Sequence, residues 1–158
     1  MHLDEVTEIL ADVLEAGCRA WVSGGWGVDA LVGRQTRAHR DLDLVVDGRD
    51  VPTAIAVLVR RGYRVETDHR PVRVELARVG VGWVDVHPVA FAQDGRGRQA
   101  GFDGARLDYP PTAFDTGSLG AAQVACLSRQ QQLSFHTGYE LRAVDLHDLA
   151  LLDALEHP

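Results

Sequence analysis

Hydrophobic residues recur at helical spacing at the start of the chain and then give way to short apolar runs. A helix is predicted over residues 3–16, with Gly17 as its C-terminal stop. Its apolar stripe consists of Leu3, Val6, Leu10, Val13 and Leu14. Residues 19–22 predict a buried strand, which the sequence Ser23-Gly24-Gly25 interrupts. A second helix is expected from about Trp26 to Val32.

The middle of the chain predicts one more helix among several strands. Residues 41–46 predict a strand, and Asp50-Val51-Pro52 favours the start of a helix that runs to Arg61. Extended runs follow at residues 63–67, 72–79 and 83–89, with a hairpin at Gly80-Val81-Gly82. We interpret residues 93–116 as loops with short strands.

The C-terminal part predicts a helical segment over residues 128–155. It comprises helices at about 128–136 and 145–155. Helices alternate with strands, a hairpin follows, and helices end the chain, an order typical of an α/β (α+β) fold in which helices flank a small mixed sheet. The length of 158 residues favours a single domain over residues 1–158.

Composition narrows the class of protein. Hydrophobic residues make up 46% and charged residues 25% of the chain, which is typical of a globular protein. Two cysteines, the absence of a basic leader and the absence of a long apolar run favour a cytoplasmic protein with no membrane partner. All 16 basic residues are arginine, which excludes lysine-dependent chemistry. The net charge of −7 disfavours a nucleic-acid partner.

Asp41 and Asp43 are the first candidate chemical groups. They alternate in a predicted strand, so both carboxylates point to one face. Neighbouring carboxylates repel each other unless a cation lies between them, and hard oxygen ligands suit Mg²⁺. The alternative is a pair of solvated aspartates at the edge of a strand.

A glycine-rich turn precedes this pair. Ser23, Gly24 and Gly25 join a strand to a helix, where free amides and the helix dipole bind phosphate. Arg37 and His39 lie just before the acidic strand and are candidates to hold triphosphate oxygens. A tight turn and a solvated loop are the structural alternatives.

Asp85 is the candidate third carboxylate. If its strand neighbours the strand of Asp41 and Asp43, Asp85 joins them as a metal ligand or as the general base for a hydroxyl nucleophile. His87 shares its face and is a candidate acceptor-binding residue, although a histidine before proline is more often structural.

Together these motifs resemble a known family. The sequence GGWGVD, then RxHxDxD at residues 37–43, then VDxHPV at residues 84–89 is similar to small antibiotic nucleotidyltransferases of the polymerase-beta-like superfamily. Within it, the chain most resembles the lincosamide and aminoglycoside 2''-nucleotidyltransferases. The similarity continues through residues 135–140 to Asp145 and Asp148.

The resemblance implies a nucleotidyltransferase fold and transfer of a nucleoside monophosphate, with ATP as the expected donor, to a hydroxyl of a small-molecule acceptor. Ser23 and Gly24 would hold the triphosphate, while Asp41, Asp43 and Asp85 would bind Mg²⁺ or act in catalysis. His136 and Tyr139 match the C-terminal motif and are candidates for acceptor binding. We also expect a homodimer, because one small domain offers little concave surface for an acceptor.

Other functions compete with this interpretation. Residues 25–30 fit the GxGxxA pattern of a dinucleotide-binding turn, with Asp47 where a ribose-binding acid would lie. An aspartate pair also occurs in metal-dependent glycosyltransferases, but the chain leaves little room for their acceptor half. A nucleotidyltransferase fold reused on another metabolite, or as an antitoxin that binds a toxin, would keep the same glycines and aspartates.

Overall fold

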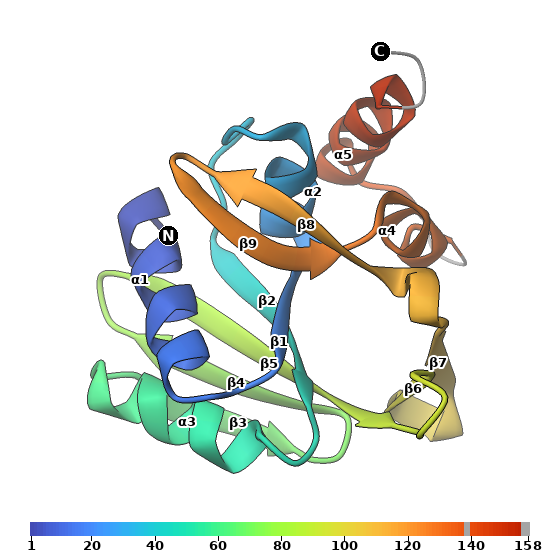
Figure 1. The fold of residues 1–158 in the computed structure, drawn as a ribbon. Coiled ribbons are helices and arrows are strands. Elements are labelled where there is room, and N and C mark those ends of the chain that lie inside the picture. Colours follow the sequence, from blue (N-terminus) through green and yellow to red (C-terminus); the bar gives the residue numbers. More distant parts are fainter. Residues whose placement is uncertain (138–139, 156–158) are drawn as a thin grey trace.

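The computed structural model describes residues 1–137 and 140–155 as helices around one mixed sheet (Figure 1). The helices are α1 (Leu3–Glu15), α2 (Gly24–Val32), α3 (Val51–Arg60), α4 (Arg129–Phe135) and α5 (Ala143–Ala154), with short 3₁₀ turns at Phe102–Gly104 and Pro111–Ala113. The strands are β1 (Ala20–Ser23), β2 (Asp41–Asp47), β3 (Arg64–His69), β4 (Arg73–Arg78), β5 (Gly82–Phe91), β6 (Gly97–Ala100), β7 (Arg106–Tyr109), β8 (Phe114–Leu119) and β9 (Ala122–Leu127).

The sheet has the order β3-β4-β5-β2-β1-β9-β8, and β6 extends from β5 and pairs with β7. Strands β2 and β5 run parallel, whereas β1 pairs with β2 in the antiparallel direction. An antiparallel β1–β2 pair is incompatible with the parallel βαβ unit of a dinucleotide-binding fold. The dinucleotide-binding interpretation of residues 25–30 is therefore wrong, and Asp47 binds Arg19 and Arg49 instead.

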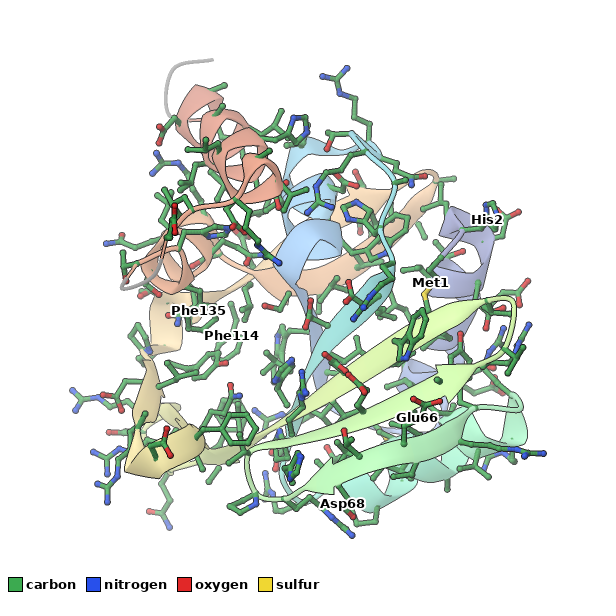
Figure 2. All side chains as sticks on the ribbon, turned by 180° about the vertical axis from the view of Figure 1, so that it is seen from behind. Met1, His2, Glu66, Asp68, Phe114 and Phe135 are labelled. Carbon is green, nitrogen blue, oxygen red and sulfur yellow. The ribbon has the colours of Figure 1, made fainter. Side chains whose placement is uncertain are left out.

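Helices α1 and α3 cover one face of the sheet, and the core lies between them and the strands (Figure 1). Alternate residues of the central strands point into this core, including Leu42 and Leu44 of β2 and Val84 and Val86 of β5. The intervening residues therefore point to the opposite face. Figure 2 shows that opposite face of β3, β4 and β5, with α1 and α3 behind the sheet. The alternation that builds the core thus directs the aspartates of β2 and β5 away from it.

Most expected elements are present, with two differences. Helix α2 begins at Gly24 rather than near Trp26, so both glycines belong to its first turn. The short strands expected among the loops of residues 93–116 include β6 and β7, which form a hairpin, whereas a second hairpin, β8–β9, is unexpected and extends the other end of the sheet. No helix in the described part of the chain is long and apolar enough to cross a membrane.

We expect Leu44→Ala to lower the free energy of unfolding by about 2–5 kcal/mol, because Leu44 is fully buried in the centre of the sheet and its loss leaves a cavity. Val79→Ala is the matched control, since Val79 is fully exposed and its truncation is expected to change stability by less than about 0.5 kcal/mol. Urea unfolding of both variants measures the difference. Equal effects would show that the core is not where the structure places it.

Candidate active site

A polar row crosses the open face of the sheet through residues that pair directly between neighbouring strands. Thr67 pairs with Glu75, Glu75 with Asp85, Asp85 with Asp43, and Asp43 with Ser23. Residues paired in this way point to the same side of a sheet. The parallel β2–β5 register thus places the Asp43 and Asp85 carboxylates side by side.

Asp85 is the most constrained of these carboxylates. Its Oδ2 accepts a hydrogen bond from Arg73 Nη1 at 3.1 Å, whereas its Oδ1 is buried and has no hydrogen-bond partner among the described residues. Burial and the neighbouring Asp43 carboxylate raise the pKa of Asp85, Arg73 offsets part of this rise, and the resulting pKa is about 6. An ionised carboxylate in this position therefore needs a further positive group.

Asp43 faces the glycine turn on one side and His87 on the other. His87 Nε2 lies 3.1 Å from Asp43 Oδ1. A Cβ atom on Gly24 would lie 2.2 Å from Asp43 Oδ2, and Gly24 has φ of +57°. Only glycine satisfies both the conformation and the close approach. The first turn of α2 therefore lies directly against one oxygen of Asp43.

Single ligand atoms of Asp43, Asp85 and His87 lie within 4.8 Å of one another, which is close enough for one metal ion. Asp41 is outside this cluster. It lines the same cleft on the same face of β2, and its carboxylate lies 3.4 Å from Arg40. The structure thus brings Asp43 and Asp85 together, adds His87, and leaves Asp41 beside them.

The cleft next to these residues has a volume of about 750 Å³. Its walls come from the α2 turn, β2, the β6–β7 hairpin, α4 and α5. Of the predicted site residues, it is lined by Ser23, Gly24, Gly25, Arg37, Asp41, Asp43, His87 and His136. Asp85 is not among the lining residues: it is buried and bonded to Arg73. Tyr139 lies outside the described residues.

Arg37 reaches this cleft because α5 holds its guanidinium. Arg37 donates from Nε and Nη2 to the two carboxylate oxygens of Asp148, at 3.0 and 2.7 Å. This bidentate pair raises the pKa of Arg37, so the side chain stays charged. A Cβ on Gly25 would lie 2.5 Å from Arg37 Nη2, which places the cation against the start of α2. A fixed cation beside free helical amides favours a phosphate group.

His39 occupies a buried position behind the same turn. Its Nε2 lies 2.5 Å from Asp29 Oδ2, and its ring packs against Trp26 with centroids 4.5 Å apart. A Cβ on Gly25 would also lie 2.5 Å from His39 Nδ1. His39 therefore supports the turn from within, while Asp29 fixes the direction of its ring.

Several site residues carried little signal in the sequence. Gln132 of α4 is almost fully buried, and its amide donates to the Gly24 carbonyl at 3.2 Å. Gln99 and Tyr109 come from the β6–β7 hairpin, in the region that the sequence predicts as loops with short strands. Arg73 lies in a predicted strand as one arginine among many. The only feature of the sequence that points to Gln132 is a run of three glutamines, residues 130–132, in the predicted C-terminal helix.

An aromatic cluster closes the end of the cleft near β7 and α4. The Tyr109 and Phe114 rings stack with centroids 6.0 Å apart, and Phe135 contacts Tyr109 edge-on at 5.7 Å. Figure 2 labels Phe114 and Phe135, which lie close to each other at the left of the view. Tyr109 and Phe135 therefore give the cleft, which Asp41 and Asp43 also line, an apolar part.

Two aspartates face each other on parallel strands, and a glycine turn that starts a helix lies beside them. This arrangement is typical of proteins with the nucleotidyltransferase fold. The model of the aminoglycoside-2''-adenylyltransferase family matches residues 5–152. The chain belongs to this family and is a nucleotidyltransferase. The family implies a nucleoside triphosphate as one substrate.

Comparison with individual proteins agrees with this membership. The chain is 35% identical over 135 residues to a lincosamide resistance protein of Staphylococcus haemolyticus, covering 85% of this chain and 84% of that protein. It is 34% identical over 91 residues to a 2''-aminoglycoside nucleotidyltransferase of Escherichia coli, covering 56% of this chain and 49% of that protein.

Solved structures show the same fold. The lincomycin-bound lincosamide adenylyltransferase LnuA matches with a TM-score of 0.87 and 33% identity, covering 96% of both chains. ANT(2'')-Ia in complex with adenylyl-2''-tobramycin matches with a TM-score of 0.76 and 20% identity, covering 98% of this chain and 92% of that one.

We expect Gly24→Ala to reduce turnover by about 100-fold, because the new methyl group must displace Asp43 Oδ2 or the start of α2. Gly17→Ala is the matched control: Gly17 also has a positive φ, of +78°, but nothing lies within 4 Å of its Cβ position. Turnover and thermal unfolding of both variants separate backbone strain from the collision. A similar loss of turnover in both variants would contradict the close approach.

Asp85→Asn is expected to stabilise the metal-free protein at about pH 7 by about 1–3 kcal/mol, because the folded state raises the pKa of Asp85 from 3.8 to about 6. A raised pKa means that ionisation costs the native state stability as the pH rises through about 6. At about pH 4 the carboxyl is protonated in the folded state and about half protonated in the unfolded state, so most of the gain should be lost. Urea unfolding at about pH 7 and about pH 4 tests this, and a variant less stable than wild type at about pH 7 would contradict it.

Proposed function

We propose that the chain transfers the nucleoside monophosphate of ATP, with Mg²⁺, to a hydroxyl group of an antibiotic, and that a lincosamide is the preferred acceptor. The observation that carries the proposal is the Asp43–Asp85 pair, in which Asp43 lies directly against a glycine turn at the wall of a cleft. The lincosamide preference rests on coverage: the lincosamide relative matches along 85% of this chain, against 56% for the aminoglycoside relative.

The donor set fits a divalent cation. Asp43 and Asp85 supply hard carboxylate oxygens, and the buried Asp85 Oδ1 has no hydrogen-bond partner in the described residues. Two carboxylates at this separation repel each other, and a cation between them removes that cost. Asp41 is placed to supply a further carboxylate from the same strand face. The chemistry that a bound Mg²⁺ supplies is neutralisation of charge on the triphosphate and on the departing pyrophosphate.

The protein residues then bind and orient the two substrates. The α2 amides at Gly24 and Gly25, with Ser23 and the Arg37 guanidinium, bind the triphosphate. This placement directs the α-phosphorus toward the open face of β2 and β5. His136, at the end of α4, also lines the cleft, where it is available to the acceptor or the nucleoside.

Asp85 is the proposed general base. In the metal-free site its pKa is raised to about 6, and a bound cation would lower it, so the Asp85 carboxylate is ionised and able to accept a proton at neutral pH. The acceptor oxygen forms a bond to the α-phosphorus while the bond from that phosphorus to the bridging oxygen breaks. The hydroxyl proton passes to Asp85, and pyrophosphate leaves. Positioning of the two substrates supplies much of the rate.

The decisive experiment incubates the purified chain with Mg-ATP and, separately, with lincomycin or tobramycin. We expect mass spectrometry to detect lincomycin heavier by one adenylyl group, with pyrophosphate released in equal amount. Asp43→Asn should lower turnover by about 1,000-fold or more while the variant remains folded.

Three results would each overturn a different part of the proposal. Tobramycin modified in preference to lincomycin would overturn the acceptor preference. Product with another nucleotide but not with ATP would overturn the donor. Full activity of Asp43→Asn would remove the carboxylate pair from the mechanism.

A further inference from the structure

A chain of hydrogen bonds links the β6–β7 hairpin to Asp43. The Tyr109 hydroxyl donates to Gln99 Oε1 at 2.5 Å, and Gln99 Nε2 lies 3.3 Å from His87 Nδ1. His87 Nε2 lies 3.1 Å from Asp43 Oδ1. Both Gln99 and Tyr109 are buried. The hairpin therefore contacts the candidate metal site through one imidazole ring.

The neighbours of Gln99 fix the orientation of its amide. Gln99 Nε2 also lies 3.5 Å from the Val72 carbonyl oxygen, which can only accept a hydrogen bond. The amide nitrogen must therefore face Val72, and Oε1 is left to accept from Tyr109. The same nitrogen faces His87 Nδ1. Because an amide NH₂ group has donors and no acceptor, His87 Nδ1 must be the acceptor of this contact.

We propose that Gln99 and Tyr109 are positioning residues that hold His87 as the tautomer with its proton on Nε2, where it donates to Asp43 Oδ1 and does not ligate the metal. In this arrangement Asp43 Oδ1 is occupied by His87, and Oδ2 faces the glycine turn at Gly24. The metal-binding role of Asp43 rests on the proposed function. The tautomer of His87 rests on the hydrogen bonds alone.

With this tautomer, Asp43 and Asp85 remain candidate metal ligands, and His87 supports Asp43 without binding the metal. A histidine binds a metal through a nitrogen lone pair, and a proton on Nε2 removes that lone pair from the side that faces Asp43. The cluster of Asp43, Asp85 and His87 therefore offers two carboxylates to a cation, which suits Mg²⁺ better than a site that includes imidazole. Residues that hydrogen-bond to a metal ligand and orient it commonly affect how tightly the metal is bound.

The tautomer can be measured without metal or substrate. We would record long-range ¹H–¹⁵N correlations of the imidazole rings in ¹⁵N-labelled protein at about pH 8, because these correlations show which ring nitrogen carries the proton. The loss of one ring's signals in His87→Gln assigns His87. We expect one tautomer with the proton on Nε2. A proton on Nδ1, or a mixture of both forms in the wild type, would overturn the proposal.

The role of Gln99 is tested by Gln99→Leu, which removes the donor to His87 Nδ1 at similar volume. We expect both tautomers of His87 to appear in this variant. An unchanged spectrum would show that Gln99 does not select the tautomer. Tyr109→Phe is the milder second variant, since it removes the partner of Oε1 and leaves the contact with Val72, and it should show less of the second tautomer.

The effect on metal use gives an independent measurement. The Mg²⁺ concentration for half-maximal turnover should rise about tenfold or more in Gln99→Leu, while kcat at saturating Mg²⁺ changes far less. Gln123→Leu, an exposed glutamine on β9, is the control and should change neither value. A fall in kcat with no change in the Mg²⁺ requirement would overturn the positioning role. If no acceptor is modified at all, the proposed function fails, and the spectrum still decides the tautomer.

Discussion

Repulsion between two carboxylates is the constraint around which this site is arranged. Asp43 and Asp85 lie directly opposite each other on parallel strands, and Asp85 is almost completely buried. Arg73 offsets part of the repulsion from one side, and His87 contacts Asp43 from the other. The folded chain therefore holds an arrangement that costs stability, which is common where a site is organised for a ligand rather than for its own packing.

The rigidity that holds these groups comes from both faces of the sheet. On the core side, α1 and α3 pack on apolar residues that alternate with the aspartates, so a shift of register would disrupt core and site together. On the opposite face, Gln132 of α4 donates to the Gly24 carbonyl, and Asp148 of α5 accepts from the Arg37 guanidinium. The C-terminal helices therefore fix the positions of one backbone carbonyl and one cation that belong to the N-terminal part of the site.

The relatives share this shape, while the antibiotics bound in their structures differ. LnuA was solved with lincomycin and ANT(2'')-Ia with an adenylylated tobramycin, and both superpose on nearly the whole of this chain. The acceptor must therefore be distinguished by side chains around the cleft rather than by the fold. In this chain the side chains that line the cleft include Tyr109 and Phe135, which contact each other, and Asp41 and Asp43 of β2.

The sequence alone determined the local elements and their chemistry. Periodicity placed most helices and strands, and alternation put Asp41 and Asp43 on one face, because these patterns depend on near neighbours in the chain. The family resemblance supplied the nucleotidyltransferase fold. The sequence did not predict the bounds of β6 and β7 or the β8–β9 hairpin. These short strands depend on pairing with distant segments more than on local preference.

Only the tertiary structure decided which groups meet. The strand register set Asp85 opposite Asp43 and left Asp41 outside their cluster. The contacts of Arg37 with Asp148, and of His87 with Gln99, join residues far apart along the chain or on separate strands. A hydrogen bond between such residues leaves no periodic trace in sequence, since it is fixed by the packing of whole elements and not by the spacing of residues along one of them.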